Sequence, residues 1–221
     1  IERGIKMGLY TGYDDVRLAT LQALRRRGVL PEAIKQLIIS MGINTNDAII
    51  SMENLLALNR KLIDPIANRY FAVLEPSVRL SLKNVEVPLT VKLYKHPNRR
   101  EELRLITLKS PCVLIERSDY ETNVGKEIRL MGLGNFIVSG ETAQFVDNDL
   151  ARAKGMPHIH WLPCETRSRI EVIDDTGNVI RGFVEEGIEN EVGRVVQLER
   201  RFFCRIEAIE DGLVKAVYTS K

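Results

Sequence analysis

The sequence lacks the features that mark membrane and secreted proteins. None of its apolar runs approaches the roughly 20 residues that a helix needs to cross a bilayer. Its charged and amphipathic start, at residues 1–6, does not have the pattern of a signal peptide. No internal repeat or low-complexity segment interrupts a composition that is 44% hydrophobic and 28% charged. We therefore expect a soluble, cytoplasmic protein that has no contact with a membrane.

Cysteine is also scarce. The three residues Cys112, Cys164 and Cys204 are far apart, and no Cys-x-x-Cys pair exists. An odd and scattered set predicts reduced, buried thiols in a cytoplasmic protein. The alternative is a zinc site that combines Cys164 with His158 and His160, but these supply only three ligands at an unusual spacing. We therefore expect no metal site.

A strong charge and catalytic motifs are lacking as well. The net charge is only +2, so an interaction with RNA would depend on local basic clusters rather than on the overall field. The sequence has no glycine-rich phosphate loop, no strand-turn-helix nucleotide fingerprint and no useful Ser/His/Asp spacing. These absences predict a binding module whose chain contains no catalytic residue.

The first third of the chain has the pattern of helices. Leucines recur at helical spacing over residues 16–28, where acids precede the segment and arginines close it, as suits the helix dipole. A second helix is expected to begin at Pro31 and to end at Gly42. A third begins near Ser51, and Pro65 kinks or ends it.

After residue 72 the period of the apolar positions changes to two. Apolar and polar residues alternate over 78–82 and 87–93, and about ten short strand-like segments, separated by turn signals, make up this part of the chain. Many short strands at short intervals favour barrels or sandwiches, and about 150 residues suffice for two small barrels. The expected fold class is α+β and multidomain, with an N-terminal helical module followed by two antiparallel β-barrels.

Six short motifs are spread over nearly the whole chain. They are Gly12-Tyr13-Asp14-Asp15-Val16-Arg17, Leu24-Arg25-Arg26-Arg27-Gly28, Leu62-Ile63-Asp64-Pro65-Ile66-Ala67-Asn68-Arg69-Tyr70-Phe71, Lys95-His96-Pro97-Asn98, Ile159-His160-Trp161 and Val196-Gln197-Leu198-Glu199-Arg200-Arg201-Phe202-Phe203. Each motif is weak alone, but their order and spacing resemble one branch of the class I aminoacyl-tRNA synthetases. That branch comprises the glutaminyl enzymes and the archaeal and eukaryotic glutamyl enzymes. The third motif resembles the archaeal glutamyl form in particular.

The resemblance implies a layout and a place in a longer enzyme. Residues 1–72 would form a helical module that meets the inner side of the tRNA. Residues 73–95 and 165–221 would form a proximal anticodon-binding barrel, and residues 96–164 a distal barrel inserted into it. The family has the first motif shortly after its mobile ATP-binding loop, so the chain is expected to start just past that loop. Catalysis with ATP and Mg²⁺ would then belong to an upstream Rossmann domain, and this chain alone would bind no cofactor and be inactive.

The segment before Gly125 favours a glutamyl over a glutaminyl enzyme. Glutaminyl enzymes carry a stretch rich in Lys, Gln and Arg there, whereas only residues 121–124 separate Tyr120 from Gly125. The resemblance thus implies a glutamate–tRNA ligase that acts on tRNA(Glu) and, in a relaxed archaeal form, also on tRNA(Gln). A monomer is expected, and a complex with an amidotransferase is left open. The rival hypotheses are a glutaminyl enzyme and a stand-alone RNA-binding or scaffold protein.

Four residues match family positions that contact the anticodon: Arg69, Arg129 and the pair Gln197 and Arg200. Unstacked bases are read by hydrogen bonds to their edges and by stacking, and arginine suits both. Each has a structural alternative, such as Arg69 pairing with Asp64 or Arg200 forming a salt bridge. Positions three apart on a strand face opposite sides, so a bulge or a strand end is needed to aim Gln197 and Arg200 at one base.

The basic run Arg25-Arg26-Arg27 has two interpretations. It pairs with phosphates on the inner side of the tRNA, or it only compensates the dipole of the preceding helix. Among the aromatic residues, Trp161 and Phe202-Phe203 are expected to be core rather than stacking platforms. His96 has no second catalytic group near it and is expected in a loop.

Overall fold

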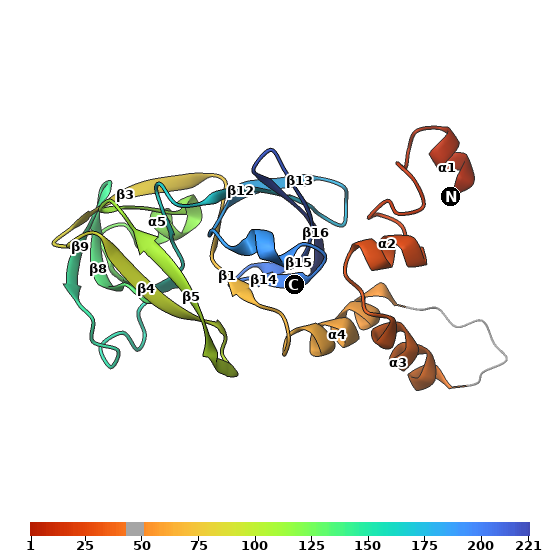
Figure 1. Ribbon diagram of the computed structural model, residues 1–221, viewed down its shortest axis with the longest axis horizontal. Helices are drawn as coiled ribbons and strands as arrows, with labels where there is room; N and C mark the ends of the chain where they lie inside the picture. Colours follow the sequence, from red (N-terminus) through yellow and green to blue (C-terminus); the bar gives the residue numbers. More distant parts are fainter. Residues whose placement is uncertain (43–50) are drawn as a thin grey trace.

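The computed structural model describes residues 1–42 and 51–221. Helices α1 to α4 lie at one end of the long axis, and two curled sheets occupy the middle and the other end (Figure 1). The described helices are α1 (Glu2–Lys6), α2 (Leu21–Arg26), α3 (Pro31–Met41), α4 (Met52–Ile63), α5 (Arg117–Asn123) and the 3-10 helix η1 (Ile188–Glu191). The described chain is therefore mostly β, and its N-terminal helical module is the smaller part.

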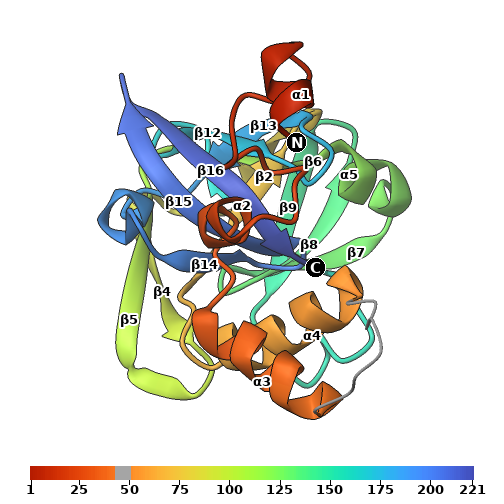
Figure 2. The same cartoon turned by 90° about the vertical axis from the view of Figure 1, so that its right-hand side faces the viewer.

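Helices α3 and α4 form where the sequence predicts them. Pro31 is the first residue of α3 and Gly42 follows its last, while the Ser51 hydroxyl caps the first turn of α4. The two helices share a small apolar core that includes Leu37 and Leu55, and they lie side by side in Figure 2. Their amphipathic faces thus stabilise each other.

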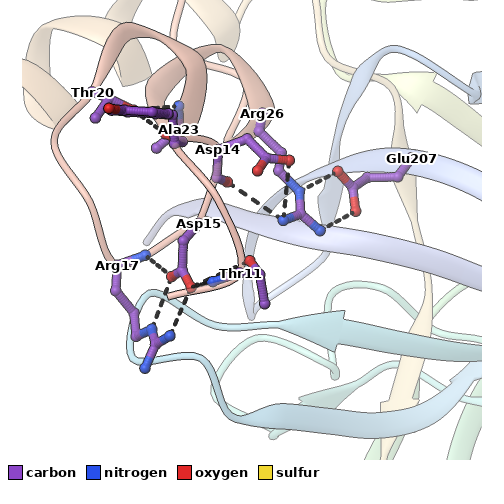
Figure 3. Close-up of polar contacts among 9 residues, drawn as sticks. Thr11, Asp14, Asp15, Arg17, Thr20, Ala23, Arg26 and Glu207 are labelled. Atoms are coloured by element: carbon purple, nitrogen blue, oxygen red, sulfur yellow. Dashed lines mark hydrogen bonds and ion pairs between the residues drawn. The ribbon is translucent and has the colours of Figure 1, made fainter. Parts of the chain in front are cut away.

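Helix α2 is shorter than the helix predicted over residues 16–28. It begins only after Thr20, whose hydroxyl accepts a hydrogen bond from the Ala23 N–H and so satisfies a free donor of the first turn. The preceding residues fold around the Asp15 carboxylate, which accepts from the Arg17 guanidinium at 2.6 and 2.8 Å (Figure 3). The acidic residues therefore anchor a loop instead of beginning the helix.

The first sheet is curled, and its two edge strands follow each other directly in the sequence. Its strand order is β1 (Arg69–Tyr70), β14 (Val195–Leu198), β15 (Phe202–Glu210), β16 (Leu213–Ser220), β12 (Ser168–Ile173), β13 (Val179–Val184) and β2 (Ala72–Leu74). Only Phe71 separates β1 from β2, so the chain itself joins the two edges. This makes the sheet barrel-like and leaves no long open edge.

The second sheet closes in the same way. Its strand order is β10 (His158–Ile159), β7 (Glu127–Leu130), β8 (Gly134–Ser139), β9 (Thr142–Asp147), β3 (Ser77–Lys83), β6 (Cys112–Glu116) and β11 (Leu162–Pro163). Only His160 and Trp161 separate its two edge strands. A hairpin of β4 (Leu89–His96) and β5 (Arg99–Leu108) contributes Val91, Ile106 and Leu108 to its core. Trp161 is fully buried there, as the sequence predicts.

Two features of the sheets differ from the expected pair of antiparallel barrels. Both sheets are mixed, because β1–β14, β12–β16, β7–β10 and β3–β9 are parallel pairs. In addition, β3 pairs with β6 and β9 of the second sheet, although the sequence-based layout kept residues 73–95 with the proximal barrel. The chain passes from the first sheet to the second between Leu74 and Ser77. The division of the chain into a helical module, a proximal and a distal barrel stays a prediction.

The bends that close the two sheets meet each other. Tyr70 and Ala72 belong to the core of the first sheet, whereas Phe71 between them is fully buried in the core of the second. The ring centroids of Phe71 and His160 are 6.1 Å apart. Because each bend lies where its own sheet closes, this contact couples the closure of one barrel to that of the other. We call the surroundings of Phe71 and His160 the junction.

Buried charges surround Phe71 at the junction. Its N–H donates to the Glu185 carboxylate, which also pairs with Arg104, and the Arg104 guanidinium lies 4.6 Å from the centre of the Phe71 ring. Burial raises the pKa of Glu185 to about 7, and the charge of Arg104 opposes that rise. Leaving one member of a buried pair without its partner costs several kcal/mol, so Arg104 and Glu185 are needed together.

The cysteines correct a prediction. Cys112 and Cys164 form a disulfide, with their Cα atoms 5.5 Å apart, because β6 and β11 pair side by side and bring together residues that are 52 apart in sequence. Only Cys204 is the free, buried thiol that the sequence predicts for all three, and burial raises its pKa to about 12. Among the described residues, no helix is long and apolar enough to cross a membrane.

The junction predicts how stability changes with pH. Burial lowers the pKa of His160 from 6.5 to about 4, and its Nδ1 accepts from the Arg200 guanidinium at 3.3 Å, which requires a neutral ring. As the pH falls from about 6.5 to about 4, the unfolded chain takes up a proton that the folded chain does not. The free energy of unfolding should therefore fall, by about 3 kcal/mol in total.

Glu185 changes the free energy of unfolding in the opposite direction, because its pKa is raised in the folded chain. As the pH falls from about 7 to about 4.5, the folded chain takes up a proton at Glu185 that the unfolded chain does not, so the free energy of unfolding rises. The effect of His160 is therefore measured as the difference between wild type and His160→Asn in urea unfolding across this range. The exposed His158→Asn serves as the control and should follow wild type. Parallel pH curves for wild type and His160→Asn would show that His160 is not buried in its neutral form.

Candidate nucleic-acid interface

Two of the predicted anticodon contacts, Arg69 and Gln197, lie side by side. Strands β1 and β14 pair in parallel, with Arg69 opposite Gln197 and Tyr70 opposite Leu198. Tyr70 and Leu198 are buried in the core of the first sheet. Because alternate residues of a strand face opposite sides, Arg69 and Gln197 point to the outer face of that sheet, where both are half-buried.

The segment that carries Arg69 is held from two directions. The tip of the β4–β5 hairpin contacts it through His96, whose Nε2 lies 2.9 Å from the Asp64 carbonyl oxygen, and through Arg99, which donates to the Asn68 side chain. His96 is thus a buried residue at the end of β4, not the loop residue that the sequence predicts. The Arg69 guanidinium lies 3.5 Å from the Asp64 carboxylate, a pair that still leaves Arg69 partly exposed.

Arg200 does not join Arg69 and Gln197. It lies beyond the end of β14, in the turn to β15, with a positive φ of 64°. There its guanidinium donates two hydrogen bonds of 2.9 Å to the Asp119 carboxylate on α5 and faces the His160 ring. The strand end separates Gln197 from Arg200, but the turn aims Arg200 at the second sheet rather than toward the face that carries Gln197.

All three charged residues of that turn reach the second sheet or its hairpin. Glu199 accepts from Arg104 on β5 at 3.2 Å, Arg200 pairs with Asp119 on α5, and Arg201 pairs with Glu116 on β6. The turn therefore fixes the two barrels relative to each other. Sequence reasoning recognised the charged run but not this role, because the partner of each residue is far away in the sequence.

Arg129 is held inside the second sheet. It lies on β7, is only 6% exposed, and donates to the side-chain oxygens of Asn135 and Asn148 at 2.8 Å each. Both partners are neutral amides, so the positive charge of Arg129 is not cancelled by these contacts. Its position in the second sheet also separates it from Arg69 and Gln197 on the first.

The three arginines at the end of α2 differ in their burial and in their partners. Arg26 donates to both carboxylate oxygens of Glu207 at 2.8 and 3.1 Å, which ties α2 to β15 (Figure 3). Arg27 is buried, with Asp175 3.9 Å away, and burial lowers its pKa. Only Arg25 is exposed. Two members of the run are thus used inside the fold, and Arg25 is the one that faces solvent.

The described residues do not assemble a metal centre. No group of three or more His, Cys, Asp or Glu side chains that could hold a metal ion occurs among them. Cys164 is engaged in the disulfide with Cys112, so it is not a thiolate that could act with His158 and His160 as a zinc ligand. The polar side chains described above are suited to hydrogen bonding and ion pairing rather than to a covalent reaction.

Arg69 and Gln197, side by side on paired strands, are side chains of the kinds that hydrogen-bond to unstacked nucleic-acid bases. The sequence was then compared with known protein families. Residues 67–153 match the model of the anti-codon binding domain of class I tRNA synthetases for glutamate and glutamine (E and Q). The matched anticodon-binding domain covers β1 to β9 and α5, so it includes Arg69 and Arg129, while Gln197 and Arg200 lie beyond it.

The chain as a whole is homologous to archaeal glutamate–tRNA ligases. The protein of that name from Methanopyrus kandleri is 38% identical over 99% of this chain, and the one from Thermofilum pendens is 40% identical over 95%. The glutamate–tRNA ligase of Archaeoglobus fulgidus is 39% identical over 99% of the chain. The chain spans only about 40% of the length of these relatives.

A charge exchange distinguishes the two roles of Arg200. If Arg200 positions the barrels through Asp119, then Arg200→Asp and Asp119→Arg should each weaken tRNA binding on the order of tenfold, because like charges would then face each other. The double variant restores an ion pair and should bind within about threefold of wild type. Binding is measured by fluorescence anisotropy with the full-length protein.

The control for this exchange is Arg181→Ala, which removes an exposed arginine that pairs with Glu171 across β12 and β13 and should change binding little. If Arg200 instead contacts a base directly, the double variant stays as weak as Arg200→Asp alone. That outcome would restore the role implied by the family resemblance.

Proposed function

We propose that this chain is the tRNA-reading part of a glutamate–tRNA ligase, an enzyme that joins glutamate to tRNA(Glu) with ATP. The observation that carries the proposal is the identity of 38–40% to such ligases over at least 95% of the chain. The anticodon-binding family of residues 67–153 supports the same conclusion. ATP and Mg²⁺ act, in this proposal, in a catalytic part that corresponds to the remaining length of the relatives.

The proposal gives the two sheets separate tasks. The first sheet acts as the proximal barrel, whose outer face offers Arg69 and Gln197 to an unstacked base. The second sheet acts as the distal barrel, in which the positive charge of Arg129, held by the neutral amides of Asn135 and Asn148, attracts the anticodon loop. Arg200 acts through Asp119 by holding the two barrels in register. The helices of residues 1–72 meet the inner side of the tRNA.

We further propose that the enzyme accepts tRNA(Gln) as well as tRNA(Glu). The two tRNAs share their first two anticodon bases and differ at the third. Glutaminyl enzymes have a basic stretch before the position of Gly125, whereas here Tyr120 to Asn123 complete the short helix α5 and only Val124 follows. With few side chains available there to discriminate the third base, one enzyme should charge both tRNAs. The glutaminyl alternative is not favoured, since the relatives named above are glutamate–tRNA ligases.

Aminoacylation by the full-length protein tests the function. We expect glutamate to be transferred to tRNA(Glu) and to tRNA(Gln), and glutamine to neither. Formation of glutaminyl-tRNA would overturn the choice of amino acid, and strong rejection of tRNA(Gln) would refute the relaxed specificity. The absence of any aminoacylation, together with no preference for tRNA over other RNA, would leave the stand-alone RNA-binding alternative.

The Gln197→Ala variant tests the face of the first sheet. A hydrogen bond to a base edge is worth about 1–2 kcal/mol, so the KM for tRNA should rise roughly tenfold. The KM values for ATP and glutamate should stay unchanged, because Gln197 lies outside the catalytic part. Gln144→Ala, which removes an exposed glutamine from β9, is the matched control. An unchanged KM for tRNA would contradict the proposed contact.

A further inference from the structure

A cleft of about 840 Å³ opens between the helices and the first sheet. It is bounded by the α2–α3 connection, by β14 and β15, and by the tip of the β4–β5 hairpin. We propose that this cleft binds the sugar–phosphate backbone of the tRNA, through Arg25 and Arg205, independently of base sequence. The inference rests on the proposed function and adds a binding site to it.

A glycine brings the two arginines to one cleft. Gly28 follows α2 with a φ of +82°, in the left-handed region, and a side chain at this position would lie 2.5 Å from Val195 and 3.3 Å from Arg205. Only glycine therefore lets the end of α2 rest directly on β14 and β15. Arg25, in the last turn of α2, and Arg205, on β15, consequently line the same cleft.

These two arginines have no anionic partner within the described part of the chain. Arg26 pairs with Glu207, but neither Arg25 nor Arg205 takes part in an ion pair or side-chain hydrogen bond to another described residue. Arg205 is nevertheless half-buried. A guanidinium that is partly withdrawn from water without a counter-ion favours binding of an anion.

The acids of the cleft are already engaged. Glu191 is buried and accepts hydrogen bonds from the Asn68 amide at 2.6 Å and from the Tyr70 hydroxyl at 2.9 Å. Glu102 lies 3.4 Å from Arg99. Arg194, which also lines the cleft, lies 3.7 Å from Glu191. Arg25 and Arg205 are therefore the cleft arginines whose charge no acid of the described chain offsets, and this excess of positive charge favours an anion.

The position of the cleft favours RNA over other anions. Val195, at its floor, lies two residues before Gln197 on β14, so both point to the same outer face of the first sheet. A backbone that leaves a base beside Gln197 and Arg69 can continue into the cleft. The exposed side chains of Leu21 and Ile66 line its rim and offer apolar contact to the ribose.

The salt dependence of tRNA(Glu) binding tests the proposal in the full-length protein. Each lost phosphate contact reduces the slope of log K against log salt concentration by about 1. We expect this reduction for Arg25→Ala and for Arg205→Ala, with affinity roughly tenfold weaker at low salt. Because phosphate carries no sequence information, the same loss should occur with a tRNA whose anticodon bases are changed.

Arg169→Ala is the matched control, because Arg169 is exposed on β12, which is not adjacent to β14 or β15 in the sheet. Arg25→Lys and Arg205→Lys retain the charge and should keep the wild-type slope. If wild type binds tRNA(Glu) while both alanine variants keep its slope and affinity, the cleft proposal fails and the proposed function stands. If wild type shows no preference for tRNA, the proposed function itself fails. A loss confined to one anticodon sequence would make the arginines base contacts and contradict backbone binding.

Discussion

The insertion of Phe71 into the core of the second sheet is the constraint on which the rest of the structure depends. Its neighbours Tyr70 and Ala72 remain in the core of the first sheet, whereas Phe71 itself packs into the core of the second at the point where the first barrel closes. Its N–H is bound by Glu185, whose charge is balanced by Arg104 on the β4–β5 hairpin. Because these groups are buried, the two barrels cannot separate without exposing an aromatic ring and leaving a charge unpaired.

Contacts around this junction also fix the position of the candidate interface. In the β14–β15 turn, Glu199 pairs with Arg104 on β5, Arg200 with Asp119 on α5 and Arg201 with Glu116 on β6. The tip of the hairpin in turn holds the segment that carries Arg69. Arg69 and Gln197 are thus presented on a preorganised surface, and a ligand need not pay for ordering them.

The sequence was informative wherever the signal is local. Pro31, Gly42 and Ser51 marked limits of α3 and α4, and alternation over residues 78–82 and 87–93 marked β3 and β4. Alternation fails to show the direction of a strand or its partner, which is why the parallel pairs and the placement of β3 were not predicted. The first helix was predicted in the right segment, but its start at residue 16 was wrong, because Thr20 caps the helix later than the acidic residues suggested.

The roles of individual side chains likewise depend on long-range contacts that local sequence patterns do not show. Family motifs identified Arg69 and Gln197, but only strand pairing brings them together. Arg200 and Asp119 are distant in sequence and meet only when both barrels are formed, as do Cys112 and Cys164. Arg26 and Arg27 resembled Arg25 in the sequence, yet their acidic or buried surroundings in the fold give each a different role. Local patterns therefore locate candidate residues, and long-range contacts decide what each can touch.

Binding of tRNA(Glu) transcripts with a substituted middle anticodon base is the most direct test of the central claim, that the two barrels read the anticodon. The full-length protein should bind such a transcript at least about tenfold more weakly than the native tRNA, because base-edge hydrogen bonds are lost and the groups that made them remain unpaired. A substitution in the acceptor stem serves as the comparison, since this chain is not proposed to contact it. Equal affinity for the native and the anticodon-substituted transcripts would contradict the account.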